Sequence, residues 1–225
     1  MHIFPTLPPV QREILRRLAT ASSLRYSELQ LDDVEGNLHT YHLKELQAAD
    51  YITKVSGGYA LSVSGRRLVG IMSTSTGHPR LQPKLTTMLA IQNGEGKFAL
   101  FRWNRHPFLG KVSLPYGKMH MGESVFAAAI REMGEKTGAA DIPLTYRGTV
   151  FIRSLESGIL LNHMETHVFS GVFEGDVAGE TDLGECFWGV LEDVPEAEWC
   201  PGFPEVMDLL AAGKPFFEEI ETVVD

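Results

Sequence analysis

Cysteine is scarce in this chain, which holds Cys186 and Cys200 among its 225 residues. Two cysteines cannot form the disulfide framework of a small secreted domain, and we expect both to be buried thiols. No run of about 18 apolar residues occurs, so the sequence predicts no membrane-spanning helix. The start, Met1-His2-Ile3-Phe4-Pro5, lacks the basic residues and apolar core of a signal peptide. We therefore expect a cytoplasmic protein with no membrane partner.

Basic charge is also in short supply, since 20 Lys and Arg stand against 29 Asp and Glu and give a net charge of −9. Residues 1–78 contain eight basic and seven acidic residues, whereas the remainder contains twelve basic and twenty-two acidic ones. Such a step in charge indicates two domains with different partners. A polar stretch interrupted by proline lies at the step. The sequence therefore predicts one domain at 1–75, a linker at 76–83 and a second domain at 84–225.

The first domain is expected to be mostly helical. A first helix follows Pro8-Pro9, with a buried face made of Val10, Ile14, Leu15 and Leu18. A short helix is expected at 26–31 and a third at 35–49, whose buried face groups Leu38, Leu43 and Leu46. Two alternating segments, 51–55 and 59–63, are joined by Ser56-Gly57-Gly58 and predict a β-hairpin. A last helix begins near Ser64 and carries Arg66 and Arg67.

Three helices followed by a Gly-Gly hairpin are the layout of a winged helix-turn-helix. Residues 41–46 (Tyr-His-Leu-Lys-Glu-Leu) and the later Tyr59-x-Leu61-x-x-x-Gly65-Arg66-Arg67-Leu68 resemble the winged-helix domains of ArsR- and MarR-type repressors. A recognition helix offers amide, hydroxyl and basic groups to base edges, and the wing holds phosphates. We accordingly predict double-stranded DNA as a partner, a homodimer, and the contact residues Asn37, Thr40, Tyr41, Lys44, Lys54, Arg66 and Arg67. The alternatives are solvated faces of a small helical domain, or a protein-interaction module.

The second domain mixes strands and helices, so the predicted fold class is α+β. Strand-like segments occur at 85–91, 98–101, 147–153, 163–173 and 186–190, and Asn93-Gly94-Glu95-Gly96 joins the first two as a hairpin. A helix is expected from Glu123 to Thr137, where Gly138 follows as a helix-ending residue. Another helix is expected from about Glu205 to Ala212.

A sharper motif spans the first of these helices. Gly117 is followed after five residues by Glu123 and after seven more by Arg131-Glu132-Met133-Gly134-Glu135-Lys136-Thr137-Gly138-Ala139. This spacing, together with Leu114-Pro115-Tyr116-Gly117-Lys118, closely resembles the Nudix box. The resemblance implies an α/β/α sandwich with a mixed sheet over residues 84–225. It also implies hydrolysis of a nucleoside diphosphate linked to another moiety, with Mg²⁺ or Mn²⁺ as cofactor.

The spacing suits such chemistry for physical reasons. Glu132 and Glu135 are three residues apart and project from one helical face, where two carboxylates can gather Mg²⁺. A metal there neutralises pyrophosphate oxygens and activates a water. Arg131 can hold a carboxylate through a bidentate fork, and Gly117 permits a close backbone approach. We predict Glu132, Glu135 and Arg131 as catalytic residues and Glu123, Glu132 and Glu135 as metal ligands.

One position departs from the family pattern, because Lys136 replaces the second glutamate of the Glu-Glu pair. If Lys136 lies on the surface as an i, i+4 partner of Glu132, a metal site can persist with a later acid such as Glu165, Glu156 or Glu174. If its ammonium replaces the charge of the metal, the pocket binds a diphosphate without cleaving it. The predicted substrate-binding residues are Gly117, Lys118, Tyr116, Arg102, Lys136 and Glu165.

A weaker pattern places His163, Glu165 and His167 on one face of a strand, where they could form a zinc site with His120. The alternative is a set of polar residues on a sheet edge or in the substrate cleft. Three functions therefore stand beside one another. They are a nucleotide-binding or nucleotide-hydrolysing regulator of transcription, a metabolic hydrolase whose winged helix serves dimerisation or substrate enclosure, and a protein-interaction adaptor.

Overall fold

The structure is a computed structural model that describes residues 7–73, 78 and 80–224, and the chain divides into two compact units, Met1–Gln82 and Pro83–Asp225. The predicted linker at 76–83 includes positions 76, 77 and 79, which lie outside the described residues, as do the first six positions. No helix in the described part of the chain is both long and apolar enough to cross a membrane.

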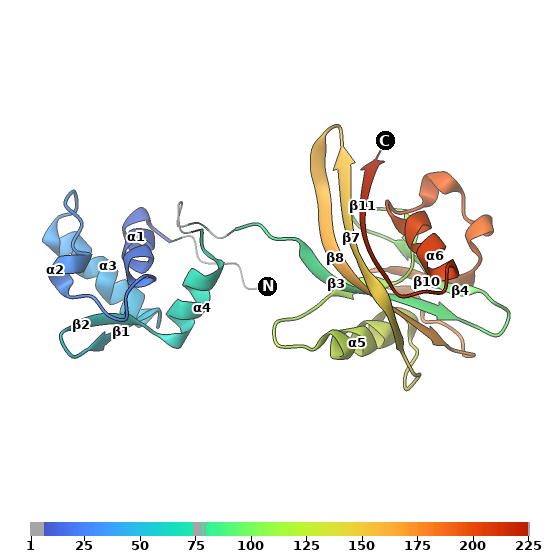
Figure 1. Cartoon of the computed structure of the whole chain (residues 1–225), viewed down its shortest axis with the longest axis horizontal. Helices are drawn as coiled ribbons and strands as arrows, with labels where there is room; N and C mark the ends of the chain where they lie inside the picture. Colours follow the sequence, from blue (N-terminus) through green and yellow to red (C-terminus); the bar gives the residue numbers. More distant parts are fainter. Residues whose placement is uncertain (1–6, 74–77, 79, 225) are drawn as a thin grey trace. The chain divides into compact units, whose positions relative to one another are not determined.

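In its described residues, 7–73, 78 and 80–82, the first unit contains four helices and a two-stranded antiparallel sheet (Figure 1). Its elements follow the order α1 (Pro9–Leu18), α2 (Tyr26–Leu29), α3 (Gly36–Ala48), β1 (Ile52–Val55), β2 (Gly58–Leu61) and α4 (Val63–Ile71). The hairpin turns at Gly57, whose φ of 84° favours glycine, and the Ser62 side chain caps the start of α4. Buried aliphatic residues of all these helices and of β1 form one cluster.

The expected buried face of α3 is wrong at one position. Leu38 is 47% exposed, whereas Leu43 and Leu46 are buried as predicted, and His39 and His42 complete the buried face. At about 100° per residue, Leu38 lies about 140° from Leu43, while His39 lies only about 40° away. Helical geometry therefore selects the histidine, although leucine is the more apolar residue.

The second unit is built on one mixed sheet of nine strands within the described residues. The strands are β3 (Lys84–Gln92), β4 (Phe98–Trp103), β5 (Val112–Ser113), β6 (Tyr116–Lys118), β7 (Thr145–Glu156), β8 (Ile159–Val172), β9 (Gly179–Thr181), β10 (Gly184–Gly189) and β11 (Phe216–Val224). Their spatial order is β11-β7-β8-β3-β4-β10-β9, with β5 paired to β4 and β6 paired to β3. The β3–β8 and β7–β11 pairs are parallel and the others are antiparallel.

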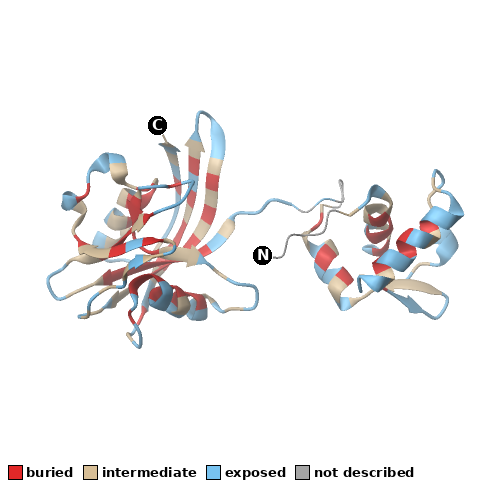
Figure 2. Ribbon diagram, turned by 180° about the vertical axis from the view of Figure 1, so that it is seen from behind, coloured by how far each residue is buried: buried red, intermediate tan, exposed pale blue. Residues whose placement is uncertain are grey.

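Helices α5 (Val125–Thr137) and α6 (Phe203–Ala211) cover opposite faces of this sheet (Figure 1). Phe126 of α5 packs edge-on against Phe169 of β8, whereas Met207 of α6 lines a cavity with the neighbouring Ser170. Adjacent residues of a strand point to opposite faces, so these contacts place the helices on different sides. Buried residues accordingly alternate along β8 (Figure 2). Two short 3₁₀ helices, Leu191–Asp193 and Glu196–Glu198, precede α6.

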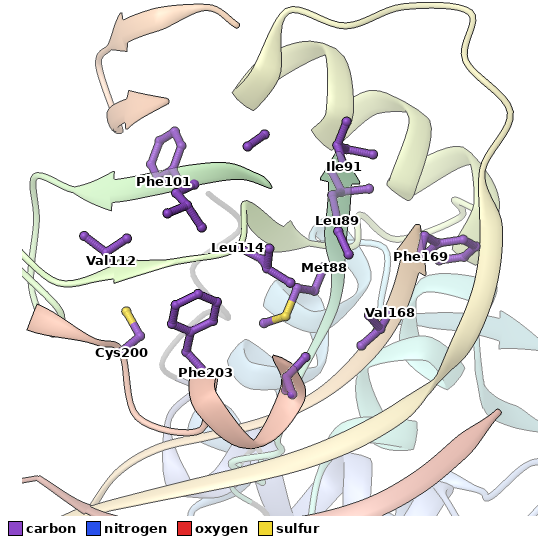
Figure 3. Packing of buried hydrophobic residues seen from close by; sticks show 14 of the residues in the cluster. Met88, Leu89, Ile91, Phe101, Val112, Leu114, Val168, Phe169, Cys200 and Phe203 are labelled. Carbon is purple, nitrogen blue, oxygen red and sulfur yellow. The ribbon is translucent and has the colours of Figure 1, made fainter. Parts of the chain in front are cut away.

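The core of this unit draws on both faces of the sheet and on α6 (Figure 3). Phe101, Phe169 and Phe203 are among its largest fully buried side chains. Cys186 and Cys200 are buried free thiols, as predicted, and burial raises the pKa of each to about 12. The structure thus has the mixed α+β architecture expected from the sequence.

Four strands were not predicted. β5, β6 and β9 are two or three residues long, too short for a hydrophobic period to show. β11 is longer, but Ile220 is the only buried residue among its nine. Its centre also contains Glu218, Glu219, Glu221 and Thr222, which give it little apolar character. Its parallel pairing with β7 holds this segment as a strand, although its composition does not indicate one.

Candidate functional site

Helix α5 is fixed at both ends by local signals. The Ser124 hydroxyl accepts a hydrogen bond from the Ala127 amide at 3.1 Å and caps the helix start. Gly138 ends the helix in the left-handed conformation with a φ of 71°. Between these ends, Glu132, Lys136 and the apolar Met133 turn inward and are buried. The charged residues of the box therefore lie at the boundary between the helix and the sheet.

Arg131 connects the helix to the loop before it. Its Nε and Nη2 donate to Oε1 and Oε2 of Glu123 at 2.7 and 2.9 Å, which is the bidentate fork expected of this residue type. Nη2 also donates to the carbonyl of Lys118 at 3.0 Å. The guanidinium and the His120 amide together lower the pKa of Glu123 to about 2. Both oxygens of Glu123 are thereby engaged by protein donors, and this residue serves to hold the loop.

Glu132 is pressed against the backbone of β6. Its Oε1 accepts a hydrogen bond from Arg131 Nη1 at 2.7 Å, whereas its buried Oε2 has no hydrogen-bond partner within the described residues. A Cβ atom at Gly117 would lie 1.8 Å from the Glu132 carboxyl carbon. Only glycine at position 117 leaves room for this carboxylate, which confirms the close backbone approach predicted there.

Lys136 is buried, and the exposed pair considered from the sequence is wrong. Its side chain is 3% exposed, and Nζ lies 4.0 Å from Oε2 of Glu132. The ammonium also lies over the rings of Phe101 and Trp103, at 5.3 and 5.4 Å from their centroids. Burial lowers the pKa of Lys136, and the Glu132 carboxylate acts in the opposite direction. The positive charge thus lies beside the carboxylate that the motif presents to a ligand.

A cavity of about 450 Å³ opens over these residues. Its aromatic side contains Trp103 and Tyr116, whose ring centroids are 4.4 Å apart, and burial raises the pKa of Tyr116. Acidic side chains are outnumbered by basic ones in the lining. The lining residues are Lys84, Thr86, Trp103, Arg105, His106, Pro107, Phe108, Tyr116, Gly117, Lys118, His120, Arg131, Glu132, Glu135, Lys136 and Leu183. Such a composition suits an anion attached to a flat or ring-shaped group.

The donor set does not fit a divalent cation in this arrangement. Glu132 offers one free oxygen and the half-exposed Glu135 a second carboxylate, but Lys136 lies against the first and Arg131 contacts both. No group of three or more His, Cys, Asp or Glu able to hold a metal occurs among the residues that the structure describes. The positive charges instead favour an anionic ligand. Mg²⁺ or Mn²⁺ as cofactor stays a prediction.

Two of the predicted substrate-binding residues lie elsewhere. Arg102 donates to the Glu198 carboxylate at 2.6 Å and to the Gly110 carbonyl, and it does not line the cavity. Glu165 lies on the face of β8 opposite Thr166, whose hydroxyl pairs with Thr86 of the cavity wall. Glu156 and Glu174 are absent from the lining as well. The four other predicted residues, Gly117, Lys118, Tyr116 and Lys136, line the cavity together.

The zinc hypothesis finds no support. Glu165 and His167 are 3.8 Å apart, but His167 is hydrogen-bonded to Thr149 at 3.0 Å. His120 instead lies 3.6 Å from Glu123. His163, Glu165 and His167 lie on β8, an inner strand of the sheet, whereas His120 lines the cavity. Of the two alternative places, a sheet edge or the substrate cleft, the cleft therefore holds for His120 alone.

Lys84 and His106 were not predicted as site residues, although both line the cavity. Lys84 is the first residue of β3, and nothing in its local sequence distinguishes it from a surface lysine. His106 belongs to the loop between β4 and β5, as does the neighbouring Arg105, which also lines the cavity. Only the pairing of β3 with β6 and the course of this loop bring them to the box.

In the first unit, the predicted DNA-contacting residues lie on its surface. Asn37, Tyr41 and Lys44 are exposed along α3, as are Lys54 on β1 and Arg66 and Arg67 on α4. Thr40 is the exception, because its hydroxyl donates to the Gly36 carbonyl and pairs with the Tyr26 hydroxyl.

Comparison with known proteins gives one family. A family model described as NUDIX domain matches residues 82–210, more than half of the chain. A curated relative, the uncharacterized Nudix hydrolase YvcI of Bacillus subtilis (strain 168), is 29% identical over 102 residues. The match covers 44% of this chain, and the chain spans 64% of the length of that relative.

Solved structures show the same fold for the second unit. The NUDIX domain of Shewanella oneidensis NrtR, crystallised with ADP ribose, has a TM-score of 0.50 and 18% identity and covers 60% of this chain and 90% of its own. A MutT protein from Bacillus halodurans has a TM-score of 0.51 and 19% identity, with coverages of 61% and 89%. At these identities the likeness concerns the fold alone.

Proposed function

The chain belongs to the NUDIX family, and from this premise we propose that it binds a nucleoside diphosphate linked to a further moiety without requiring a metal ion. The ligand class comprises ADP-ribose, nucleotide sugars and dinucleotides. The first unit then acts as a winged helix-turn-helix that couples ligand binding to transcription. The NUDIX domain of NrtR, which has a similar fold, was crystallised with ADP ribose, and this makes ADP-ribose the first ligand to test.

The observation that carries the proposal is the buried ammonium of Lys136. It lies 4.0 Å from Glu132 Oε2, where the family pattern has a second glutamate that commonly binds metal. A diphosphate placed in the cavity meets this fixed charge together with Arg105, which lines the same space. Cleavage in this family depends on a metal ion that activates a water, so a site that binds the ligand without the ion would leave it intact. Retention of an intact ligand is what a sensor requires.

A second candidate is a metabolic pyrophosphohydrolase, and one observation favours it. Nudix hydrolases generally use a divalent metal such as Mg²⁺, and Glu132 Oε2 is a buried oxygen with no hydrogen-bond donor among the described residues. In that case Glu132 and the half-exposed Glu135 would supply the carboxylates. Hydrolysis then requires that the Lys136 ammonium leaves its present position.

The test is a binding and turnover assay on the full chain. ADP-ribose, dinucleotides, nucleotide sugars and nucleoside triphosphates are each offered with EDTA, with Mg²⁺ and with Mn²⁺. The proposal predicts binding in EDTA, no product with either metal, and metal-dependent product from the Lys136→Glu variant. Turnover by the wild type that Glu135→Gln abolishes would overturn it in favour of the hydrolase. Lys97→Glu, at a lysine that does not line the cavity, is the matched charge control.

Coupling to transcription rests on the exposed surface of α3 and the hairpin. Tyr41 and Lys44 project into solvent from one helix, as base-contacting residues of a recognition helix do. Because one such helix reads a short half-site, we propose that the DNA-binding form is a homodimer.

A mobility-shift assay with the chain's own upstream DNA, with and without ADP-ribose, tests this coupling. Lys44→Gln is expected to weaken every complex and to lower the salt dependence, because it removes a cation. An absence of binding by the wild type would favour the adaptor or the hydrolase.

A further inference from the structure

Two lysines of the cavity form a second positive site that the box does not explain. Lys84 begins β3, and Lys118 ends β6, which pairs with β3 in the register Thr86 to Lys118. Lys84 is therefore the diagonal neighbour of Lys118 across this antiparallel pair, and both line the cavity. Neither lysine forms an ion pair with a carboxylate among the residues that the structure describes.

A hydrogen bond to a buried asparagine fixes the Lys84 side chain at the cavity wall. Its Nζ donates to Oδ1 of Asn162 at 2.5 Å, and Asn162 is 4% exposed on the neighbouring strand β8. Burial and the nearby Lys118 both lower the pKa of Lys84. Two like charges kept close together repel one another, and a bound anion removes that repulsion.

This lysine pair is separated from the charge at Lys136. Tyr116 and Lys118 both face the cavity from β6, two residues or about 7 Å apart along the strand. Tyr116 contacts Trp103, over which Lys136 lies, so Lys136 belongs to the Tyr116 end. The Glu132 carboxylate packs on Gly117, which points to the other face of β6, and lies beside Lys136. One cavity thus presents two positive sites, of which the one at Lys136 has a carboxylate beside it.

From this arrangement we infer that the ligand carries a second anionic group, such as a phosphate monoester, remote from its diphosphate, and that Lys84 and Lys118 bind it. The inference rests on the proposed function, since it assumes that a diphosphate occupies the end near Lys136. Because the two positive sites are about 7 Å apart along β6, an uncharged spacer such as a sugar joins the two anions. The ligand class is accordingly a phosphorylated derivative of a diphosphate-linked nucleotide.

Calorimetry on the full chain in EDTA tests this with three probes. They are ADP-ribose, 2′-phospho-ADP-ribose and ADP-ribose 1″-phosphate, which place the extra phosphate at opposite ends of the molecule. We expect one of the phosphorylated probes to bind at least tenfold more tightly than ADP-ribose. This advantage should fall to threefold or less in Lys118→Gln, whose exposed side chain has no structural role, and in Lys84→Gln. It should persist in the control Lys97→Gln.

The outcomes distinguish failure of the second anion site from failure of the proposed function. If ADP-ribose binds and neither added phosphate improves its affinity, the second site is refuted while the proposed function stands. If a phosphate improves affinity equally in wild type and in both lysine variants, the extra contact lies elsewhere and the inference is again refuted. If none of the three probes binds, the proposed function fails with it.

Discussion

The Nζ atom of Lys136 lies 4.0 Å from Oε2 of Glu132, and both side chains are almost fully buried one helical turn apart. A buried pair of this kind is strongly destabilised when one partner is removed, because the other charge then remains without compensation. The Arg131 contact to Glu132 Oε1 provides part of that compensation for the carboxylate alone. The relationship gives Lys136 a structural role beside the ligand-binding role that we propose for it.

A double-mutant cycle should measure this pair. Lys136→Met and Glu132→Gln are each expected to lower the free energy of unfolding, and the double variant should lose less than their sum. The expected coupling is about 1–3 kcal/mol, the range found for residues in contact. Urea unfolding followed by tryptophan fluorescence is suitable, because Trp103, Trp188 and Trp199 all belong to the second unit. The cycle at the exposed pair Glu95 and Lys97 should give a much smaller coupling, and equal couplings would contradict the assignment.

Gly117→Ala tests the packing of Glu132 against β6. The added methyl group would lie within 2 Å of the carboxyl group, so the helix or the strand must shift. We expect a loss of about 1–3 kcal/mol in stability, as for overpacking elsewhere, together with weaker nucleotide binding. Thermal unfolding and calorimetry measure the two effects. Gly134→Ala in α5 is the matched control, because its Cβ meets only an ordinary contact and alanine favours helix by up to about 1 kcal/mol. A tolerated Gly117→Ala would refute the tight fit.

Glu123→Gln should change how stability depends on pH. The folded pKa of Glu123 is about 2, below the ordinary value of 4.5, because Arg131 and the His120 amide favour its charged form. Its contribution is therefore fully present above pH 4.5 and is lost as the pH falls towards 2. The variant should be less stable than wild type at pH 7, and the difference should shrink between pH 4.5 and 2. Urea midpoints across this range measure it, with the exposed Glu192→Gln as control. A difference independent of pH would contradict the fork.

His39 predicts a pH-sensitive first unit. Its ring is fully buried, neither nitrogen has a hydrogen-bond partner among the described residues, and Tyr26 packs edge-on against it. Burial, Arg17 and His42 all lower its pKa from 6.5, so the folded state favours the neutral ring. Stability is then present above pH 6.5 and is lost as the pH falls through the lowered folded value.

His39→Leu should reduce that loss, since leucine carries no titrating group. Amide hydrogen exchange along α3 between pH 8 and 5, corrected for intrinsic rates, reports opening of this unit separately from the second. The exposed His120→Gln serves as the control and should leave the exchange of α3 unchanged. Equal acid sensitivity of wild type and His39→Leu would show that another group is responsible.

Much of this architecture was predictable because its signals are local. The capping serine and the left-handed Gly138 mark the ends of α5 within one or two residues of the expected bounds. The bidentate fork of Arg131 was expected from its residue type, whereas its partner Glu123 had been predicted as a metal ligand. The Gly57-Gly58 turn likewise gave the hairpin. By contrast, Arg102 and Glu165 were placed in the site by residue type alone, and the strand faces that they occupy direct them elsewhere.

The sequence by itself determined the family motif, the glycine that admits Glu132, and the presence of a lysine where a glutamate is expected. Only the tertiary structure decided that this lysine is buried over Phe101 and Trp103, and that Lys84 joins Lys118 at the other end of the cavity. Capping and periodicity act over a few residues and are legible in the chain. Burial and charge proximity depend instead on which distant strands pack together, and here the pairing of β3 with β6 and β8 sets both.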